Sequence, residues 1–274
     1  MKDTRQLAIF SYTILSLLAA IMIFPFFWMF FSSFKSLDEI FQLTLFPANP
    51  SLDNYIQIFT SRHSMFPLWF LNSLIVAVCT TISVLFFDSI LGYTLSKFNF
   101  PGKKIIFFVI ISTLMIPTEM LVIPWYQISS AMRWGNTHWG MMFPGMMSAF
   151  GMFLMRQFMM AIPDDLLDAA RIDGKNEFSI FLTIALPLSS SALATLAIFN
   201  FISNWNAFFW PLIIASKSTT FTLPVGLANF SSEAGSEWNL IMAGATVAMI
   251  PLIAIFLIFQ QQIIKGISLS GMKG

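Results

Sequence analysis

The feature that most constrains the fold of this chain is its division into six long apolar blocks separated by more polar segments. About 20 helical residues cross the ~30 Å hydrocarbon core of a bilayer, so each block is long enough to span a membrane. A helix satisfies its own backbone hydrogen bonds, which lipid cannot do. The sequence therefore predicts an all-α membrane protein with six transmembrane helices. The predicted spans are Leu7–Phe31, Leu68–Leu95, Ile105–Tyr126, Trp139–Met160, Leu188–Ala215 and Asn239–Ile264.

The composition agrees with this class and excludes others. The chain is 57% hydrophobic and 10% charged, whereas a soluble domain carries roughly a quarter charged residues. A net charge of +1 gives no basic stripe for a nucleic acid. The single cysteine, Cys79, excludes an internal disulfide framework and a cysteine metal site. We expect one transmembrane domain over residues 1–274, in contact with membrane lipid.

The distribution of basic residues predicts the orientation of the spans. Lysine and arginine concentrate in cytoplasmic segments of membrane proteins. If the N-terminus lies inside, ten of the fourteen basic residues fall on the cytoplasmic side. We therefore expect both termini in the cytoplasm. The inner set is Lys2, Arg5, Lys97, Lys103, Lys104, Arg156, Arg171, Lys175, Lys265 and Lys273, and the outer set is Lys35, Arg62, Arg133 and Lys217.

The loop over residues 161–187, between the fourth and fifth predicted spans, contains a short helix with both ends marked. Pro163 suits the first helical position, and Asp164 and Asp165 suit the positive end of the helix dipole. Gly174 suits the left-handed residue just beyond the helix. By periodicity alone this is an ordinary amphipathic loop helix, and the alternative is a helix that docks into another protein. The expected docking face holds Leu166, Ala169, Ala170 and Asp173.

Several motifs, in order along the chain, resemble one family. Asp168-Ala169-Ala170, Gly174 and Ile184-Ala185-Leu186-Pro187 resemble the "EAA…G…I-x-LP" loop of binding-protein-dependent ABC importer permeases. The stretch from Asn204 to Leu212 is similar to the "WN-x-F-x-x-PL" segment of the carbohydrate-uptake branch. Further similarities are the segments 47–55, 136–139 and 271–274. The chain thus resembles the inner-membrane subunit type of the second maltose permease and the glycerol-phosphate permease.

The resemblance implies a type I ABC importer permease fold with a short cytoplasmic coupling helix, in a bacterial inner membrane. It implies a sugar or oligosaccharide as cargo and alternating access driven from outside the chain. The implied partners are a second permease, two ATPase subunits that hold ATP and Mg²⁺, and an external solute-binding protein. The implied ATPase-coupling residues are Asp168, Ala169, Ala170, Arg171, Asp173, Gly174 and Pro187.

Two positions depart from the family pattern. Asp168 stands where the family usually has glutamate, which keeps the charge but shortens the reach of any ion pair to an ATPase. Ala207 replaces an acidic residue of many relatives. The chain also lacks G-x-x-x-x-G-K-[ST], the phosphate-binding loop of many ATPases. We therefore expect no bound cofactor, no catalysis by this chain, and ATP hydrolysis on a separate subunit.

A few polar residues inside the predicted spans are candidates for the substrate pathway. Asp88 and Glu119 are costly to bury as ions, so each would line a cavity, relay protons or form structural hydrogen bonds. Asn204 and Asn206 can bond sugar hydroxyls, although buried amides also hold helices together. Trp205 can stack on a sugar ring or belong to an aromatic belt. These five residues form the expected pathway set.

Two other function classes compete with the importer hypothesis. An ion-coupled secondary transporter would use Asp88 and Glu119 and would need no ATPase partner. A membrane enzyme or receptor needs a catalytic or ligand constellation. The scarcity of histidine, cysteine and paired acids in the spans counts against that class.

Overall fold

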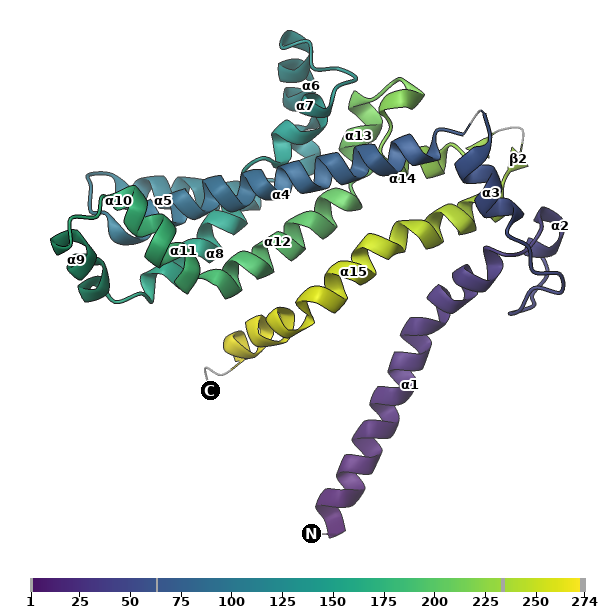
Figure 1. Cartoon of the computed structure of the whole chain (residues 1–274), viewed down its shortest axis with the longest axis horizontal. Coiled ribbons are helices and arrows are strands. Elements are labelled where there is room, and N and C mark those ends of the chain that lie inside the picture. Colours follow the sequence, from purple (N-terminus) through teal and green to yellow (C-terminus); the bar gives the residue numbers. More distant parts are fainter. Residues whose placement is uncertain (1, 63, 233–234, 272–274) are drawn as a thin grey trace. The chain divides into compact units, whose positions relative to one another are not determined.

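The computed structural model of the chain describes residues 2–62, 64–232 and 235–271 and is almost entirely helical (Figure 1). Its contacts divide it into two compact units. Unit 1 comprises Met1–Pro67 and Gly226–Ile250, and unit 2 comprises Leu68–Val225 and Pro251–Gly274. Three helices have residues in both units: α4 (Phe66–Lys97), α14 (Leu223–Ala228) and α15 (Trp238–Gly271).

Unit 1 is organised around a polar loop that follows the first helix. The buried side-chain amide of Asn54 donates to the carbonyl oxygens of Ser33 and Lys35, both at 2.8 Å. The Oδ1 of Asn54 accepts a bond from Asn239 at 2.7 Å. Asn54 therefore ties the end of the first helix to the start of α15. The remaining elements are α1 (Lys2–Ser32), α2 (Leu37–Ile40), α3 (Asp53–Thr60) and the antiparallel strands β1 (Ser231–Ser232) and β2 (Gly235–Ser236).

Unit 2 holds most of the elements and the larger apolar core. Figure 1 shows α9 and α10 at one end of this unit and α7 and α13 toward the other. The core joins α4, α8 and α12 to the loop helices through buried residues such as Val84, Met155 and Leu196. The elements are α5 (Lys103–Ser112), η1 (Thr113–Met115), η2 (Thr118–Leu121), α6 (Val122–Ala131), α7 (His138–Met142), η3 (Phe143–Gly145), α8 (Ala149–Met160), α9 (Asp164–Ile172), α10 (Glu177–Ile180), the π-helix η4 (Phe181–Ala185), α11 (Leu186–Leu188), α12 (Ser190–Trp205), α13 (Phe209–Ile214) and η5 (Ser218–Thr220).

Within the described residues, three single helices are long and apolar enough to cross a membrane: Ile9–Ser32, Phe66–Lys97 and Trp238–Gln260. Two more candidates are bent pairs. Lys103–Met115 and Thr118–Ala131 meet at 100°, and Glu177–Leu188 and Ser190–Trp205 meet at 80°. The first, second and sixth predicted spans thus correspond to single helices, and the all-α class is confirmed. The count of six spans stays a prediction.

The third, fourth and fifth predicted spans are not continuous helices, which differs from the sequence expectation. In the third, Ile116 precedes Pro117 and is extended, with φ −86° and ψ 117°, because the proline ring crowds a helical residue before it. In the fourth, the extended Ser148 separates η3 from α8. In the fifth, α12 ends at Trp205 and α13 begins at Phe209. At these breaks some backbone groups lack the hydrogen bonds that a continuous helix would supply.

Candidate functional site

The loop helix α9 ends where the sequence predicts, but it begins one residue later, because Pro163 was expected at the first helical position. Pro163 is the extended residue before the helix, and two aspartates follow in the first turn. At the other end Gly174 has φ +81°, a left-handed conformation that glycine adopts without strain. The N–H of Gly174 donates to Arg171 and that of Lys175 donates to Ala170, both at 3.0 Å. This Schellman pattern satisfies the last carbonyl groups and stops the helix.

The faces of α9 differ from the expected arrangement. Ala170 is 5% exposed and packs with Leu167 in the core of unit 2, so it does not lie on a free surface. Ala169, one residue earlier, is exposed, as are Leu166 and Ile172. The expectation that Ala170 lies on the exposed side is therefore wrong, while Leu166, Ala169 and Asp173 are exposed as expected. Adjacent residues in a helix lie about 100° apart, which allows Ala169 and Ala170 to have opposite surroundings. We call the exposed set Leu166, Ala169, Ile172 and Asp173 the α9 face.

Charged side chains fix α9 to the rest of unit 2. The nearly buried Lys97, at the end of α4, donates to the carbonyl of Ile162 and to Asp164 at 2.7 Å. That hydrogen bond holds the pKa of the Asp164 carboxyl below its ordinary value. Both contacts hold the start of α9 against the end of α4.

Arg171 forms a second set of ion pairs at the other end of α9. It donates to Glu177 at 2.7 Å and also pairs with Asp168. The hydrogen bonds that Arg171 donates to Glu177 and, second, to Asp168 raise the pKa of the guanidinium above its ordinary value. Glu177 in turn accepts from the hydroxyl of Tyr93 on α4 at 3.1 Å. Asp168 and Arg171 therefore bond within the chain, and their expected role toward an ATPase remains a prediction.

Pro187, the last of the expected coupling residues, lies apart from the α9 face. It is exposed within α11, two residues before Ser189, where the helix turns by 80° into α12. Helix α11 directly follows the π-helix η4, near the end of the helical segment Glu177–Leu188.

A cavity of about 340 Å³ opens between the broken helices of unit 2. Its polar side chains come from η2, the start of α8 and α12, and two indole rings close it from α6 and α13. Among the described residues that line it, none is charged. We call it the polar cavity. Its polar and aromatic lining residues are Thr118, Ser148, Asn200, Ser203, Asn204, Trp125 and Trp210.

Hydrogen bonds orient the amide groups of the polar cavity. The side-chain nitrogen of Asn204 donates to the carbonyl and Oδ1 of Asn200, at 2.9 and 3.0 Å. Thr81 also donates to Asn200 Oδ1, at 3.1 Å. Gly145 faces Asn204 so closely that a Cβ would lie 3.1 Å from its Oδ1. The pair thus forms a fixed set of polar groups.

The other expected pathway residues do not line this cavity. Trp205 is buried, 5.8 Å from Phe201 and 5.2 Å from Phe70 between ring centroids. Asn206 is exposed just beyond the end of α12. Four lining residues, Thr118, Asn200, Ser203 and Trp210, do not belong to the expected pathway set. A helical projection from Asn204 points to Asn200, but no sequence signal places Thr118 beside α12.

The two acidic candidates have different surroundings. Glu119 is exposed in η2, in the bend next to Thr118. The side chain of Asp88 is fully buried, and both its oxygens lie 3.1 Å from the N–H of Ser148. Ser148 is also the N-cap of α8 and accepts from the N–H of Gly151 at 3.1 Å. Asp88 therefore sits at the positive end of the α8 dipole, where a carboxylate is stabilised.

Two glycines allow α4 and α8 to pack closely. A Cβ on Gly92 would lie 2.7 Å from the Cβ of Met155. A Cβ on Gly151 would fall inside contact distance of Asp88 Oδ2 and 3.0 Å from a methyl group of Leu196. Arg156 adds a hydrogen bond to the carbonyl of Leu95 at 3.1 Å. With the Lys97 contacts, α4 is thus bonded along the whole of α8, from the polar cavity to the start of α9.

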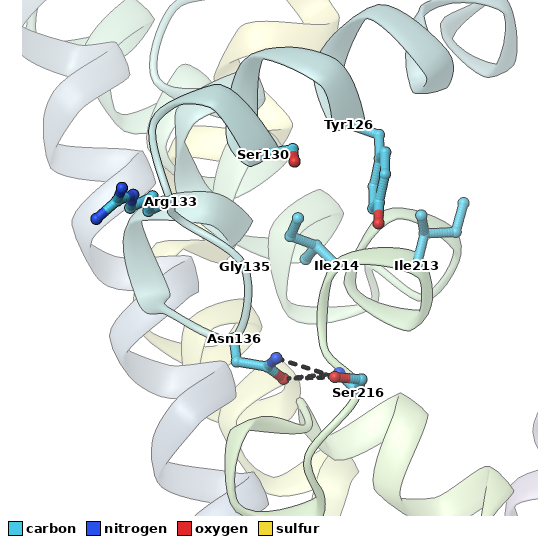
Figure 2. Close-up of a pocket in the computed structure, with 8 residues that line it drawn as sticks. All are labelled: Tyr126, Ser130, Arg133, Gly135, Asn136, Ile213, Ile214 and Ser216. Atoms are coloured by element: carbon cyan, nitrogen blue, oxygen red, sulfur yellow. Dashed lines mark hydrogen bonds between the residues drawn. The ribbon is translucent and has the colours of Figure 1, made fainter.

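A second cavity of about 340 Å³ lies near the turn between α6 and α7 (Figure 2). Its wall is held by Asn136, which has φ 56° and accepts from the N–H groups of Ser216 and Lys217 at 2.7 and 2.9 Å. Figure 2 shows Arg133, its charged lining residue, directed away from Tyr126. The described residues contain no cluster of three His, Cys, Asp or Glu that could hold a metal ion.

Comparisons with known proteins found a matching family and similar relatives. Residues 88–269 match a family described as the binding-protein-dependent transport system inner membrane component. The arabinooligosaccharides transport system permease protein AraQ of Bacillus subtilis is 35% identical over 262 residues, covering 94% of this chain and 93% of AraQ. The sn-glycerol-3-phosphate transport system permease protein UgpE of Salmonella typhi is 32% identical, covering 97% and 98%.

Solved structures show the same fold. A chain of a bacterial ABC transporter involved in the import of the acidic polysaccharide alginate superposes with a TM-score of 0.85 at 23% identity, covering 95% of this chain and 98% of that chain. A bacterial alginate ABC transporter in complex with a periplasmic protein bound to an alginate pentasaccharide gives a TM-score of 0.69 at 13% identity, with 94% of each chain covered.

Proposed function

Because this chain belongs to the family of binding-protein-dependent transport system inner membrane components, we propose that it is a permease subunit of an ATP-driven sugar importer. Its cargo is a sugar or oligosaccharide that crosses by alternating access. The observation that carries this proposal is the single run of bonded helices between the polar cavity and the α9 face. Ser148 begins α8 at the cavity, and α9 follows the other end of α8 after a short connection.

The α9 face fits the surface that an ATPase subunit would grip. Leu166 and Ile172 are exposed apolar side chains, and Ile172 is 87% exposed. Ala169 lies between them with a side chain small enough to allow close approach of another protein. Burial of such apolar groups favours association. ATP and Mg²⁺ then belong to the partner, and this chain is a transport subunit without a catalytic role.

The contacts among α4, α8 and α9 would transmit a movement of α9 to the polar cavity. Lys97 fastens α4 to the start of α9, while Gly92 and Gly151 seat α8 against α4. Closely packed interiors shift as units and do not deform continuously. We therefore expect α4, α8 and α9 to move together when an ATPase pulls on α9, which changes the position of Ser148 in the cavity wall.

The remaining features of the assembly follow from the same hypothesis. The chain spans the bacterial inner membrane six times with both termini in the cytoplasm, so that the α9 face is on the ATPase side. A second permease completes the pathway, because a cavity of about 340 Å³ is small for an oligosaccharide. An external binding protein delivers the cargo. The solved alginate transporter in complex with a periplasmic protein bound to an alginate pentasaccharide supports this partner.

The ion-coupled alternative has no specific support. Both oxygens of Asp88 face the N–H of Ser148 at the start of α8, so this acid has a structural hydrogen-bonding role. Glu119 is exposed in a different element. An ion-coupled transporter would also give no reason for an exposed apolar face on a charged loop helix.

Co-purification tests the proposed assembly. We expect this chain, tagged and extracted in mild detergent from its native membrane, to retain a second permease and an ATPase subunit. A tagged, unrelated six-span protein from the same membrane is the control. The control shows whether the extraction conditions leave membrane complexes intact. If the control keeps its own complexes and this chain is recovered alone, the proposal is contradicted.

A further inference from the structure

We propose that the polar cavity accepts uncharged polyhydroxy solutes and excludes anionic ones such as sugar phosphates and uronates. This inference rests on the proposed function and specifies the cargo at the same site. Family membership does not decide the matter, because the import of both neutral and anionic solutes is compatible with one permease fold. The chemistry of the lining residues decides it.

The lining offers partners for hydroxyl groups but none for a negative charge. Asn200 and Asn204 present amide groups, and Thr118 and Ser203 present hydroxyl groups. No lysine or arginine belongs to the described lining of this cavity. Moving a charged group out of water without a counter-charge costs much more free energy than moving a hydroxyl group that finds a new hydrogen bond. A phosphate or carboxylate would therefore be poorly held.

One structural element at the cavity would ordinarily attract an anion, namely the N-terminus of α8. Free N–H groups and the helix dipole make such an end an anion site. Here the site is already used from within the chain. The carboxylate of Asp88 accepts the N–H of Ser148, and the hydroxyl of Ser148 accepts the N–H of Gly151. Groups of the chain itself therefore occupy this end of α8 and leave no open N–H site there for a solute anion.

The position of Glu119 adds to this effect. It follows directly after Thr118, a lining residue, in the bend of the third predicted span. Glu119 therefore places an acidic residue directly beside one lining residue of the cavity. Electrostatic repulsion in a site partly shielded from water is stronger than in bulk solvent.

The aromatic side chains favour a sugar over other neutral solutes. Trp125 and Trp210 lie with ring centroids 5.7 Å apart at 74°. The indole N–H of Trp210 donates to the carbonyl of Gly140 at 2.9 Å, which fixes the orientation of the ring. A fixed indole ring provides an apolar surface for one face of a sugar ring, while the amides bond its hydroxyl groups.

Direct binding to the assembled importer, without its external binding protein, tests this selectivity. The probes are arabinotriose and maltotriose, which are neutral, and trigalacturonate, which has a carboxylate on each ring. Saturation-transfer NMR on the complex in nanodiscs reports the binding of each probe. We expect a neutral trisaccharide to bind at least about tenfold more tightly than trigalacturonate, and Asn204→Leu to weaken the neutral probe. We expect Ser203→Lys to increase trigalacturonate binding about tenfold, since it supplies the missing counter-charge.

Each other outcome contradicts the inference. Equal binding of trigalacturonate and the neutral probes by the unaltered complex would overturn the exclusion of anions. Failure of both neutral probes to bind, or an unchanged response in the Asn204 variant, would overturn the assignment of the cavity. Neither result would alter the co-purification of the ATPase, so failure of this inference is distinguishable from failure of the proposed function.

Discussion

Replacement of Ala169 by arginine is expected to lower ATP-driven uptake at least tenfold while the protein still folds and inserts. Ala169 is exposed at the middle of the α9 face, so a large charged side chain there does not disturb the core of unit 2. It would instead hold the ATPase away from Leu166 and Ile172. A loss of about 1.4 kcal/mol at that contact corresponds to a factor of ten. The measurement is vesicle uptake of the sugar that the cognate binding protein retains, with the amount of co-purified ATPase.

Two matched variants distinguish an effect on ATPase docking from an effect on folding. Ala169→Ser keeps a small side chain and should preserve uptake. Ala170→Arg places the same large group one residue later, where the native side chain is 5% exposed against the core. We expect that variant to reduce the amount of folded protein in the membrane, because a buried unpaired charge is strongly destabilising. If Ala169→Arg transports normally, the α9 face is not the coupling surface.

The second large effect is expected at Gly151. An alanine there would bring its Cβ into contact with the carboxylate of Asp88 and against Leu196. The carboxylate would have to leave the N–H of Ser148, or α8 would have to move away from α4. Overpacking of a tight core costs roughly 1–3 kcal/mol. Gly151→Ala should therefore lower both the thermal stability of the purified complex and its uptake.

A double variant tests whether the carboxylate causes this loss. Asp88→Ala removes the contact, so Gly151→Ala should cost much less stability in the Asp88→Ala background than alone; close neighbours couple in this way. Asp88→Asn keeps an oxygen that accepts the Ser148 N–H and should retain most uptake. Loss of uptake in Asp88→Asn at normal stability would point instead to proton transfer by Asp88. Additive losses in the double variant would contradict the proposed packing.

The sequence predicted α9 well because helix ends are local. Proline, acidic first-turn residues and a left-handed glycine act on their own few residues. Gly174 lies where these rules place it, and Pro163 lies one position before the helix. The face of α9 was harder to predict. Ala169 and Ala170 are identical in chemistry, and which of them meets the core depends on the distant residues of α4, α10 and α12.

The lining residues of the polar cavity were harder still to predict than the α9 face, because tertiary contacts determine them. Hydropathy detects the six apolar blocks but averages over the interruptions inside three of them. Thr118 reaches the cavity because of the 100° bend around Pro117, and Trp205 is withdrawn from it by packing with Phe70 and Phe201. The sequence marks Asp88 as costly to bury, yet its partner is a backbone N–H 60 residues away. Residue type alone does not identify such a partner.

ATP-dependent uptake into reconstituted vesicles tests the central claim most directly. One set of vesicles contains the complete assembly with its binding protein, and a matched set lacks only the ATPase subunits. An imposed ion gradient, with and without an ionophore, is applied to both. The account predicts sugar uptake only where ATPase and ATP are present, and the same rate after the ion gradient is collapsed. Accumulation of sugar by vesicles that lack the ATPase, driven by the ion gradient, would contradict it.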